Sequence, residues 1–548
     1  ARTHACDPAP YPTTYPPTPE VHMENGMMLQ GFSWYLPADG AHWKRLAELA
    51  PTLAHMGVSS VWMPPAYKSS EGAEGVGYAV YDPWDLGEFD QCGSVRTKYG
   101  TRREYLSAIR ALQKSGIQVL ADVVLNQRFG GEECEDVLAT PINPANRNEQ
   151  AGEPRQISAW THYRFPGRGD KYSDFHWDWH CFHGTDWDES THEPGVYLFD
   201  GKHWDEDVDK SENGNYDYLM GSDVDVSEPA VEEELGRWGE WYLKTTGVDG
   251  FRLDALKHIS RAFFHRWLTH LREATGKELF TVGEYWSPEV EDLESYLGEV
   301  PMSLFDVPLH YRLFDASNSM GERDLAHVFD DTLVQREPIR AVTFVDNHDT
   351  QPNQALQSTV QDWFKPSAYM LILLREAGYP CVFFGDLFGM SNDGNIPAVA
   401  ELPLLMELRQ RFAFGPQNDY LDDANLIGWT REGDDAHPMS GVAVMLTDAE
   451  GGSKRMCVGA RHAGSTFCCV AGSEEPDVTT DDEGFGEFSC AGGCGCAYVR
   501  KEVVSSLEHD RVLRSIQRIV QKVQEPRYEY CPVSVNAAPH RTRARKGK

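Results

Sequence analysis

Short apolar segments recur along most of the chain, and segments with helical spacing of apolar residues separate them. Eight of the apolar segments are rich in β-branched and aromatic residues, which is typical of buried strands. They lie at 27–35, 58–64, 118–126, 248–254, 279–284, 303–309, 341–348 and 381–385. Eight strands that alternate with helices predict an α/β fold, a (β/α)8 TIM barrel.

One helix illustrates the local signals. Ser260 is suited to cap its first turn, and Gly276 is suited to end it. The apolar residues between them recur at helical spacing, at Phe264, Trp267, Leu268 and Leu271. The segment 248–284 is therefore predicted to be one strand–helix–strand unit.

Two stretches depart from this alternation. Residues 127–225 are rich in Trp, His, Asp and Gly, and they separate the third predicted strand from the fourth. A long insertion after a barrel strand lies at the end where active sites form, so we expect this irregular, β-rich domain to serve function. Across 416–500 the helices stop, and short strands with glycine turns predict a C-terminal antiparallel β-sandwich.

These boundaries divide the chain into five parts. They are a proline-rich segment at 1–25, a catalytic barrel at 26–126 and 226–415, the inserted domain at 127–225, the β-sandwich at 416–500 and a tail at 501–548. Within the tail, 502–524 has the apolar spacing of an amphipathic helix, and the last residues are basic. No role is assigned to this tail.

Composition narrows the classes of partner. The chain has 85 acidic and 50 basic residues, a net charge of −35, which disfavours nucleic acid and anionic membranes. No apolar run approaches the length of a membrane span. The first residue is Ala1, which favours a processed, secreted protein, with a cytoplasmic location as the alternative. The pairing of the 12 cysteines cannot be deduced from the sequence.

Three carboxylates stand at the ends of predicted barrel strands: Asp254 in GFRLDALKHI, Glu284 in FTVGEYW and Asp349 in FVDNHDT. Arg252 shares a strand face with Asp254 and is expected to keep it ionised. An ionised carboxylate beside a sugar ring can attack the anomeric carbon, and Glu284, among apolar neighbours, suits a general acid. One such acid is more often a cap or part of a salt bridge, whereas three in one barrel favour a catalytic site.

The chain resembles the α-amylase family of glycoside hydrolases, and in particular the bacterial liquefying α-amylases. DVVLNQ, GFRLDALKH, GEYW and FVDNHD match the four signature motifs of the family, and the likeness runs from about 27 to 500. The resemblance implies that Asp254 is the nucleophile, Glu284 the acid/base and Asp349 the transition-state stabiliser. The implied reaction is retaining, endo-acting hydrolysis of internal α-1,4 bonds in starch, glycogen and maltooligosaccharides, by a monomer.

The resemblance also implies the residues that bind sugar. Tyr78 matches the tyrosine that stacks at the cleavage point, and Arg252 and His348 match residues that hold the nucleophile and hydroxyl groups. The leaving-group side is matched by Lys257 and His258, and Trp286 is a candidate platform there. Trp34 and Tyr81 are further candidates to line the cleft, and for them packing in the core is the alternative interpretation.

The first motif departs from the family pattern. It ends in Asn126-Gln127 here, where the family has Asn-His, and that histidine normally touches the primary hydroxyl of the sugar. Gln127 retains hydrogen-bonding groups but cannot become cationic. We therefore expect a working site with an altered affinity or pH response.

A calcium site is implied by the same resemblance. Its ligands would be Asn126, Asp217, Asp223 and the backbone oxygen of His258, with Asp205 and Asp225 as further candidates; hard oxygens of this kind suit Ca²⁺. The bacterial relatives carry a calcium–sodium–calcium cluster, and two of its carboxylate positions are changed here, to His183 and Ser227. The second calcium and the sodium are thereby put in doubt, and we predict one calcium ion.

Two other functions compete with this interpretation. One is a transglycosylase or an α-1,6-glucosidase of the same family, and the other is a glycan-binding protein that has lost catalysis. Retention of Asp254, Glu284 and Asp349 disfavours the inactive protein. The resemblance to liquefying α-amylases across the insertion disfavours the other enzymes.

Overall fold

The computed structural model describes residues 25–390 and 394–508. The proline-rich segment lies outside this part, apart from Asn25. Most of the helix predicted at 502–524 also lies outside it, and its described start contains α11 (Lys501–Val504). No helix of the described ranges is both long and apolar enough to cross a membrane.

Eight parallel strands close into a barrel, in the order β1-β17-β16-β15-β14-β13-β5-β2. They are β1 (Met27–Gln30), β2 (Val58–Met63), β5 (Gln118–Val123), β13 (Gly250–Leu253), β14 (Phe280–Gly283), β15 (Ser303–Phe305), β16 (Ala341–Phe344) and β17 (Tyr379–Phe383). Each overlaps one predicted segment, so the TIM barrel is confirmed. The strands are buried almost throughout, which explains their nearly continuous apolar sequences.

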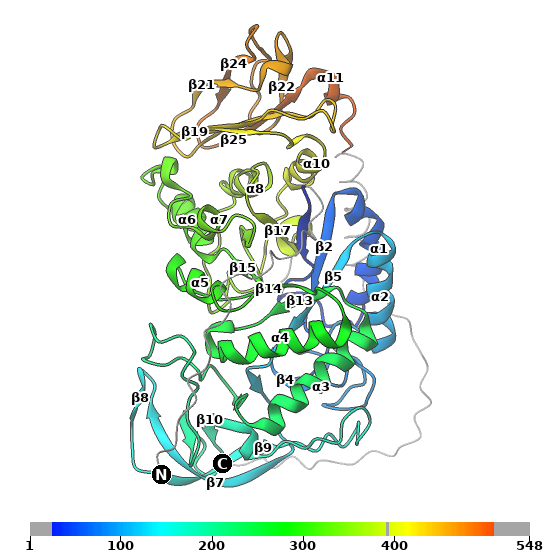
Figure 1. Ribbon diagram of the computed structural model, residues 1–548, viewed down its shortest axis with the longest axis vertical. Coiled ribbons are helices and arrows are strands. Elements are labelled where there is room, and N and C mark those ends of the chain that lie inside the picture. The colour runs from blue at the N-terminus through cyan, green and yellow to red at the C-terminus, as the bar shows by residue number, and fades with distance from the viewer. Residues whose placement is uncertain (1–24, 391–393, 509–548) are drawn as a thin grey trace, which may run out of the picture.

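Helices surround these strands (Figure 1). They are α1 (His42–His55), α2 (Arg102–Lys114), α3 (Pro229–Thr246), α4 (Arg261–Thr275), α5 (Val290–Leu297), α6 (Val307–Asn318), α7 (Leu333–Arg336), α8 (Lys365–Leu373), α9 (Phe384–Phe388) and α10 (Leu402–Phe412). The helix predicted between Ser260 and Gly276 is α4, in which the Ser260 side chain accepts a hydrogen bond from the Phe263 N–H. Gly276 ends it at a φ of 64°, the left-handed conformation that favours glycine.

The insertion between β5 and β13 is mainly an antiparallel sheet, seen below the barrel in Figure 1. Its order is β6-β12-β10-β11-β7-β8, and β9 pairs with β7. The strands are β6 (Gln127–Arg128), β7 (Glu133–Asn143), β8 (Asn146–Gln150), β9 (Arg155–His162), β10 (Phe182–Asp188), β11 (Glu193–Phe199) and β12 (Ser222–Val224). Before the insertion, β3 (Lys68–Ser69) pairs with β4 (Val80–Asp82).

The C-terminal strands form two antiparallel sheets, at the end of the molecule opposite the insertion (Figure 1). The larger contains β18 (Gln417–Tyr420), β19 (Leu426–Arg431), β20 (Val442–Thr447), β25 (Gly495–Arg500), β22 (Thr466–Ala471) and β23 (Val478–Thr479). The smaller pairs β21 (Gly452–Cys457) with β24 (Phe485–Cys490). A separate apolar core, which includes Phe467, Phe488 and Tyr498, lies in this part, as the antiparallel β-domain prediction required.

Candidate active site and metal centre

Asp254 and Glu284 follow directly on two adjacent barrel strands. β13 and β14 pair in parallel with Leu253 opposite Gly283, so the next residue of each strand lies at the same edge. The guanidinium of Arg252 connects them: Nη1 donates to Asp254 Oδ1 at 2.5 Å, and Nη2 donates to Glu284 Oε2. All three side chains are buried. The structure therefore brings these predicted residues together around one cation.

Asp122 completes this group, and the sequence analysis did not identify it. It lies on β5, the other neighbour of β13, and its Oδ1 accepts from Arg252 Nη1 at 2.9 Å. Its Oδ2 accepts from Trp62 Nε1 at 2.9 Å and from the Tyr78 hydroxyl at 2.8 Å. The sequence did contain a signal for Asp122, namely an acidic residue inside an otherwise apolar strand. A carboxylate in such a strand is buried only when a partner satisfies it, so it indicates a polar site.

The electrostatics differ from the expectation for Asp254. Burial raises the pKa of the Asp254 carboxyl well above its ordinary value, and the neighbouring charges of Glu284 and Asp122 add to this, while Arg252 opposes it. Arg252 was expected to keep Asp254 ionised, and burial together with two neighbouring carboxylates opposes that ionisation. Arg252 acts against a strong desolvation penalty, which makes its hydrogen bond the main support for a charged Asp254.

His348 and Asp349 lie in the loop after β16, which β15 separates from β14 in the barrel. The side-chain amide of Gln30 donates to His348 Nδ1 at 2.9 Å, which leaves the ring proton on Nε2, 3.2 Å from Asp349 Oδ2. Burial and Arg252 lower the pKa of His348, so the ring is a neutral donor. Burial and the charge of Glu284 raise the pKa of Asp349 to about 7. Gln30 was also missed by the sequence analysis.

Three aromatic rings lie nearly parallel beside these groups. The ring centroids of Tyr78 and His348 are 5.1 Å apart with 10° between their planes, and those of Trp34 and Tyr78 are 5.9 Å apart with 1° between them. Trp34 thus stacks with Tyr78 and His348. Tyr81 instead packs against Phe165 and donates its hydroxyl proton to Glu132, which favours the alternative of core packing.

Lys257, His258 and Trp286 also lie in this region. Lys257 Nζ donates to the Trp286 carbonyl at 3.0 Å and to a carboxylate oxygen of Glu212 at 2.6 Å. Burial lowers the pKa of His258 to about 3, and its Nδ1 is 2.7 Å from the carbonyl of Tyr216. His258 is therefore neutral and ties the barrel to the inserted segment next to Asp217.

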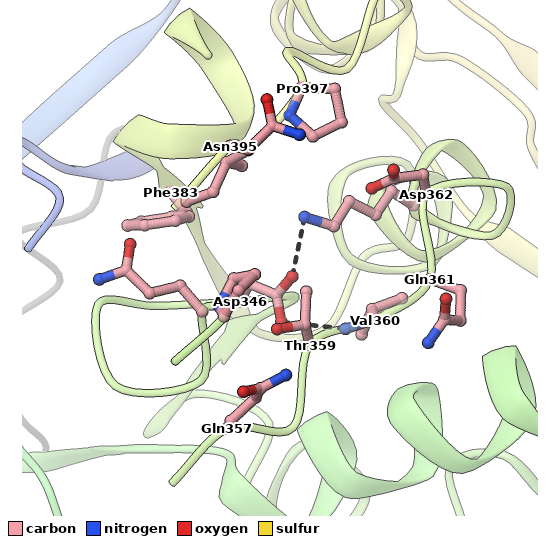
Figure 2. Close-up of a pocket in the computed structure, with 13 residues that line it drawn as sticks. Asp346, Gln357, Thr359, Val360, Gln361, Asp362, Phe383, Asn395 and Pro397 are labelled. Atoms are coloured by element: carbon pink, nitrogen blue, oxygen red, sulfur yellow. Dashed lines mark hydrogen bonds and ion pairs between the residues drawn. The ribbon is translucent and has the colours of Figure 1, made fainter. Parts of the chain in front are cut away.

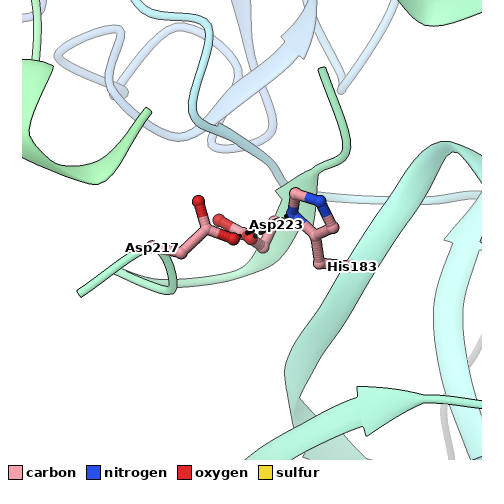
Figure 3. A group of neighbouring side chains, drawn as sticks. All are labelled: His183, Asp217 and Asp223. Atoms are coloured by element: carbon pink, nitrogen blue, oxygen red, sulfur yellow. Dashed lines mark hydrogen bonds and ion pairs between the residues drawn. The ribbon is translucent and has the colours of Figure 1, made fainter. Parts of the chain in front are cut away.

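Two of the predicted metal ligands, Asp217 and Asp223, lie beside His183 (Figure 3). Nδ1 of His183, on β10, lies 3.1 Å from Asp217 Oδ2 and 3.0 Å from Asp223 Oδ2. Burial and the charge of Asp217 raise the pKa of Asp223 well above its ordinary value. The side-chain nitrogen of buried Asn126 has no hydrogen-bond partner among the described residues. The two buried carboxylates have the donor chemistry of a site for a hard cation.

Two further candidates differ in their availability. Burial and the charge of Asp217 raise the pKa of Asp205 to about 7, so it belongs to the same electrostatic group. Asp225 is already engaged: Oδ2 accepts from Lys202 Nζ at 2.6 Å, and Oδ1 accepts from Ser227 Oγ at 2.5 Å. His183 Nε2 also lies 3.1 Å from Asp225 Oδ1. Protein cations and a hydroxyl thus occupy the oxygens of Asp225.

A cavity of about 240 Å³ lies behind the loop that carries Asp349 (Figure 2). Buried Lys365 donates to Asp346 Oδ2 at 2.9 Å and to Asp386 Oδ1 at 2.5 Å. Asp346 Oδ1 in turn accepts from the N–H of Val360. These contacts hold Asp346, three residues before Asp349, and so support the loop that carries Asp349. The cavity lies next to this loop.

Comparisons with known proteins agree with this geometry. A family model described as alpha amylase, catalytic domain, matches residues 42–410. The chain is 49% identical over 482 residues to the alpha-amylase of Bacillus licheniformis, with 87% of this chain and 94% of that protein covered. It is 42% identical over 498 residues to the cytoplasmic alpha-amylase of Escherichia coli (strain K12), with 88% of this chain and 100% of that protein covered.

Among solved structures, an α-amylase of Anoxybacillus matches with a TM-score of 0.57 at 15% identity, covering 87% of this chain and 96% of that chain. This likeness concerns the fold. The family resemblance inferred from the four motifs is confirmed by the sequence matches. The chain therefore belongs to the α-amylase family.

Proposed function

We propose that this protein is an α-amylase that hydrolyses internal α-1,4 bonds of starch-type glucans with retention of configuration. The observation that carries the proposal is the pair of carboxylates, Asp254 and Glu284, that share the guanidinium of Arg252. Two carboxyl groups bound to one guanidinium are necessarily close. Close spacing, about 5–5.5 Å, is what a retaining glycosidase requires.

In the proposed mechanism, an Asp254 carboxylate oxygen forms a bond to the anomeric carbon as the bond to the leaving oxygen breaks. Glu284 gives its proton to the leaving oxygen. Glu284 then takes a proton from water, whose oxygen attacks the anomeric carbon and displaces Asp254. Asp349, across the mouth from this pair, is proposed to stabilise the positive charge that develops on the sugar ring.

The aromatic and polar groups around the mouth are proposed to hold the sugar. The nearly parallel rings of Tyr78 and Trp34 offer apolar faces to a glucose ring. Neutral His348, oriented by Gln30, offers an Nε2–H donor. Lys257, His258 and Trp286 are proposed for the leaving-group side. The contacts of Tyr81 with Phe165 and Glu132 favour a packing role for Tyr81.

We also propose that one calcium ion is held by Asn126, Asp217, Asp223 and the backbone oxygen of His258. The buried carboxylates repel each other, and a bound calcium would neutralise them and join the insertion to the barrel. His183 contacts both Asp217 and Asp223 where the bacterial relatives have a carboxylate. Together with the engaged Asp225, this supports one calcium and disfavours a second calcium or sodium.

The remaining proposals concern the oligomeric state, the location and the binding partners of the protein. We propose a secreted monomer that binds neither nucleic acid nor membranes, in keeping with its net charge of −35. A cytoplasmic location is the alternative, and the name of the Escherichia coli relative favours it. Transglycosylation and α-1,6 hydrolysis remain alternatives that product analysis on amylose distinguishes: cyclic products indicate transfer, and mixed maltooligosaccharides indicate endo-hydrolysis.

An assay on soluble starch tests the function directly. Glu284→Gln keeps the size of the side chain but removes the ionisable acid, so the rate should fall by at least about 100-fold. A chelator should remove activity from the unmodified protein, and added calcium should restore it. Full activity of Glu284→Gln, in a protein whose unfolding temperature is unchanged, would overturn the mechanism.

A further inference from the structure

Three cysteine thiols lie together in the C-terminal β-domain, far along the chain from the catalytic residues. Cys469 is on β22, Cys490 ends β24 and Cys496 is on β25. Ser473 lies beside two of them: its carbonyl is 3.3 Å from Cys469 Sγ and its hydroxyl is 3.0 Å from Cys496 Sγ. Cys490 and Cys496 belong to one apolar core, and Cys469 packs against it. All ten cysteines in the described ranges are free thiols.

Strand pairing explains why these thiols meet. Cys469 is opposite Tyr498 on the neighbouring strand, and Cys496 lies two residues before Tyr498, so Cys469 and Cys496 are diagonal neighbours on one face of the sheet. Cys490 reaches the same core from the smaller sheet, and the Tyr498 hydroxyl donates to the Ser489 carbonyl at 2.7 Å beside it. Cys468 precedes Cys469 and points to the opposite face.

The arrangement suits disulfide chemistry better than metal binding. In the described part of the chain, the one group of three or more His, Cys, Asp or Glu side chains whose ligand atoms all lie within 4.8 Å of one another is His183, Asp217 and Asp223. The three sulfurs therefore do not surround a single ion. Cys496 is instead a central thiol with one partner on each side.

We propose that Cys469, Cys490 and Cys496 form a thiol–disulfide exchange site in which Cys496 is the common partner. The site reacts with small-molecule disulfides such as oxidised glutathione. Cys469 is partly exposed whereas Cys490 and Cys496 are buried, so the reaction enters at Cys469. Hydrogen bonds from the two flanking thiols and from Ser473 lower the pKa of Cys496, which supports its role as the attacking thiolate in the second step.

The steps balance as two thiols oxidised and one disulfide reduced. Cys469 loses its proton to solvent, and its sulfur attacks the small disulfide, which forms a mixed disulfide and releases one thiolate. Cys496 then loses its proton to solvent and attacks Cys469 Sγ, which closes a protein disulfide and releases the second thiolate. Attack of Cys490 on Cys496 would move the bridge to the 490–496 pair and free Cys469.

The test uses the full-length folded protein treated with oxidised glutathione, followed by thiol titration and peptide mass spectrometry without reduction. We expect loss of two thiols to one internal bridge that always contains Cys496. In Cys496→Ser the bridge should be absent, and glutathione should remain attached to Cys469. Cys468→Ser, changed on the adjacent residue of the same strand, should form the same bridge as the unmodified protein.

Cys490→Ser provides a second variant, and it should retain the 469–496 bridge. Starch hydrolysis checks that each variant is folded, since the site lies outside the barrel. A 469–490 bridge, a bridge that survives in Cys496→Ser, or no reaction at these three thiols in the unmodified protein would overturn the proposal.

Discussion

The side-chain nitrogen of Gln127 donates to the backbone carbonyl of Tyr78 at 3.1 Å. Its side-chain oxygen is buried and has no hydrogen-bond partner in the described residues. The glutamine that replaces the histidine of the family motif therefore uses its donor to hold the loop carrying the stacking tyrosine.

Gln127→His should change both kcat/KM on maltooligosaccharides and its pH profile. The imidazole adds a group that titrates near neutral pH, and it alters the contact with Tyr78. Steady-state kinetics between pH 5 and 8 measure the change. Gln127→Leu, which removes the hydrogen bond to the Tyr78 carbonyl but keeps most of the volume, should weaken substrate binding. A kcat/KM and pH profile unchanged in Gln127→His would contradict the expectation.

Asp349→Asn should lose activity and yet stabilise the fold at alkaline pH. Burial raises the pKa of Asp349 to about 7, above the value of about 3.9 in an unfolded chain. The folded state thus binds the proton more tightly, and the stability that this contributes is lost as the pH rises through 7. The asparagine variant does not lose this stability, so above pH 7 its free energy of unfolding should exceed that of the unmodified protein by about 2 kcal/mol.

Denaturant unfolding at pH 5 and pH 8, at constant calcium, measures this difference. The gain of Asp349→Asn over the unmodified protein should be larger at pH 8. An equal difference at both pH values would show that the carboxyl ionises in the folded state as easily as in the unfolded chain.

His183→Asp should raise the calcium content of the dialysed protein from about one ion to about two, because it restores an oxygen ligand next to Asp217 and Asp223. Elemental analysis per mole of protein measures the content. His203→Asp is the matched control, since it adds the same charge at an exposed position nearby. Three tightly held calcium ions in the unmodified protein would refute the prediction of one.

Asp122→Asn should lower kcat/KM by about 10- to 100-fold, since hydrogen bonds to charged groups contribute about 1.5–3 kcal/mol. The change removes the negative partner of Arg252 and disturbs the hydroxyl of Tyr78. Kinetics on soluble starch and a thermal melt test it together. Asp170→Asn, at a side chain that is 73% exposed, should change neither quantity, and normal kinetics in Asp122→Asn would remove Asp122 from the site.

The sequence by itself determined the barrel and the placement of the principal carboxylates. A strand that is buried on both faces has a nearly continuous apolar sequence, which can be recognised locally. The residue after each strand must lie at one edge of a parallel barrel. For that reason the positions of Asp254 and Glu284 along the chain were enough to place them together. The helix between Ser260 and Gly276 was predictable for a similar reason, because its caps and apolar spacing are local.

The tertiary structure decided which remote side chains share a hydrogen bond. Asp122 meets Trp62, Tyr78 and Arg252 only because barrel closure puts β5 between β2 and β13. Gln30 orients His348 across more than 300 residues of sequence, where no local spacing records the contact. Packing also raises the pKa of Asp254, since desolvation depends on everything that surrounds a carboxyl and not on its neighbours in the chain.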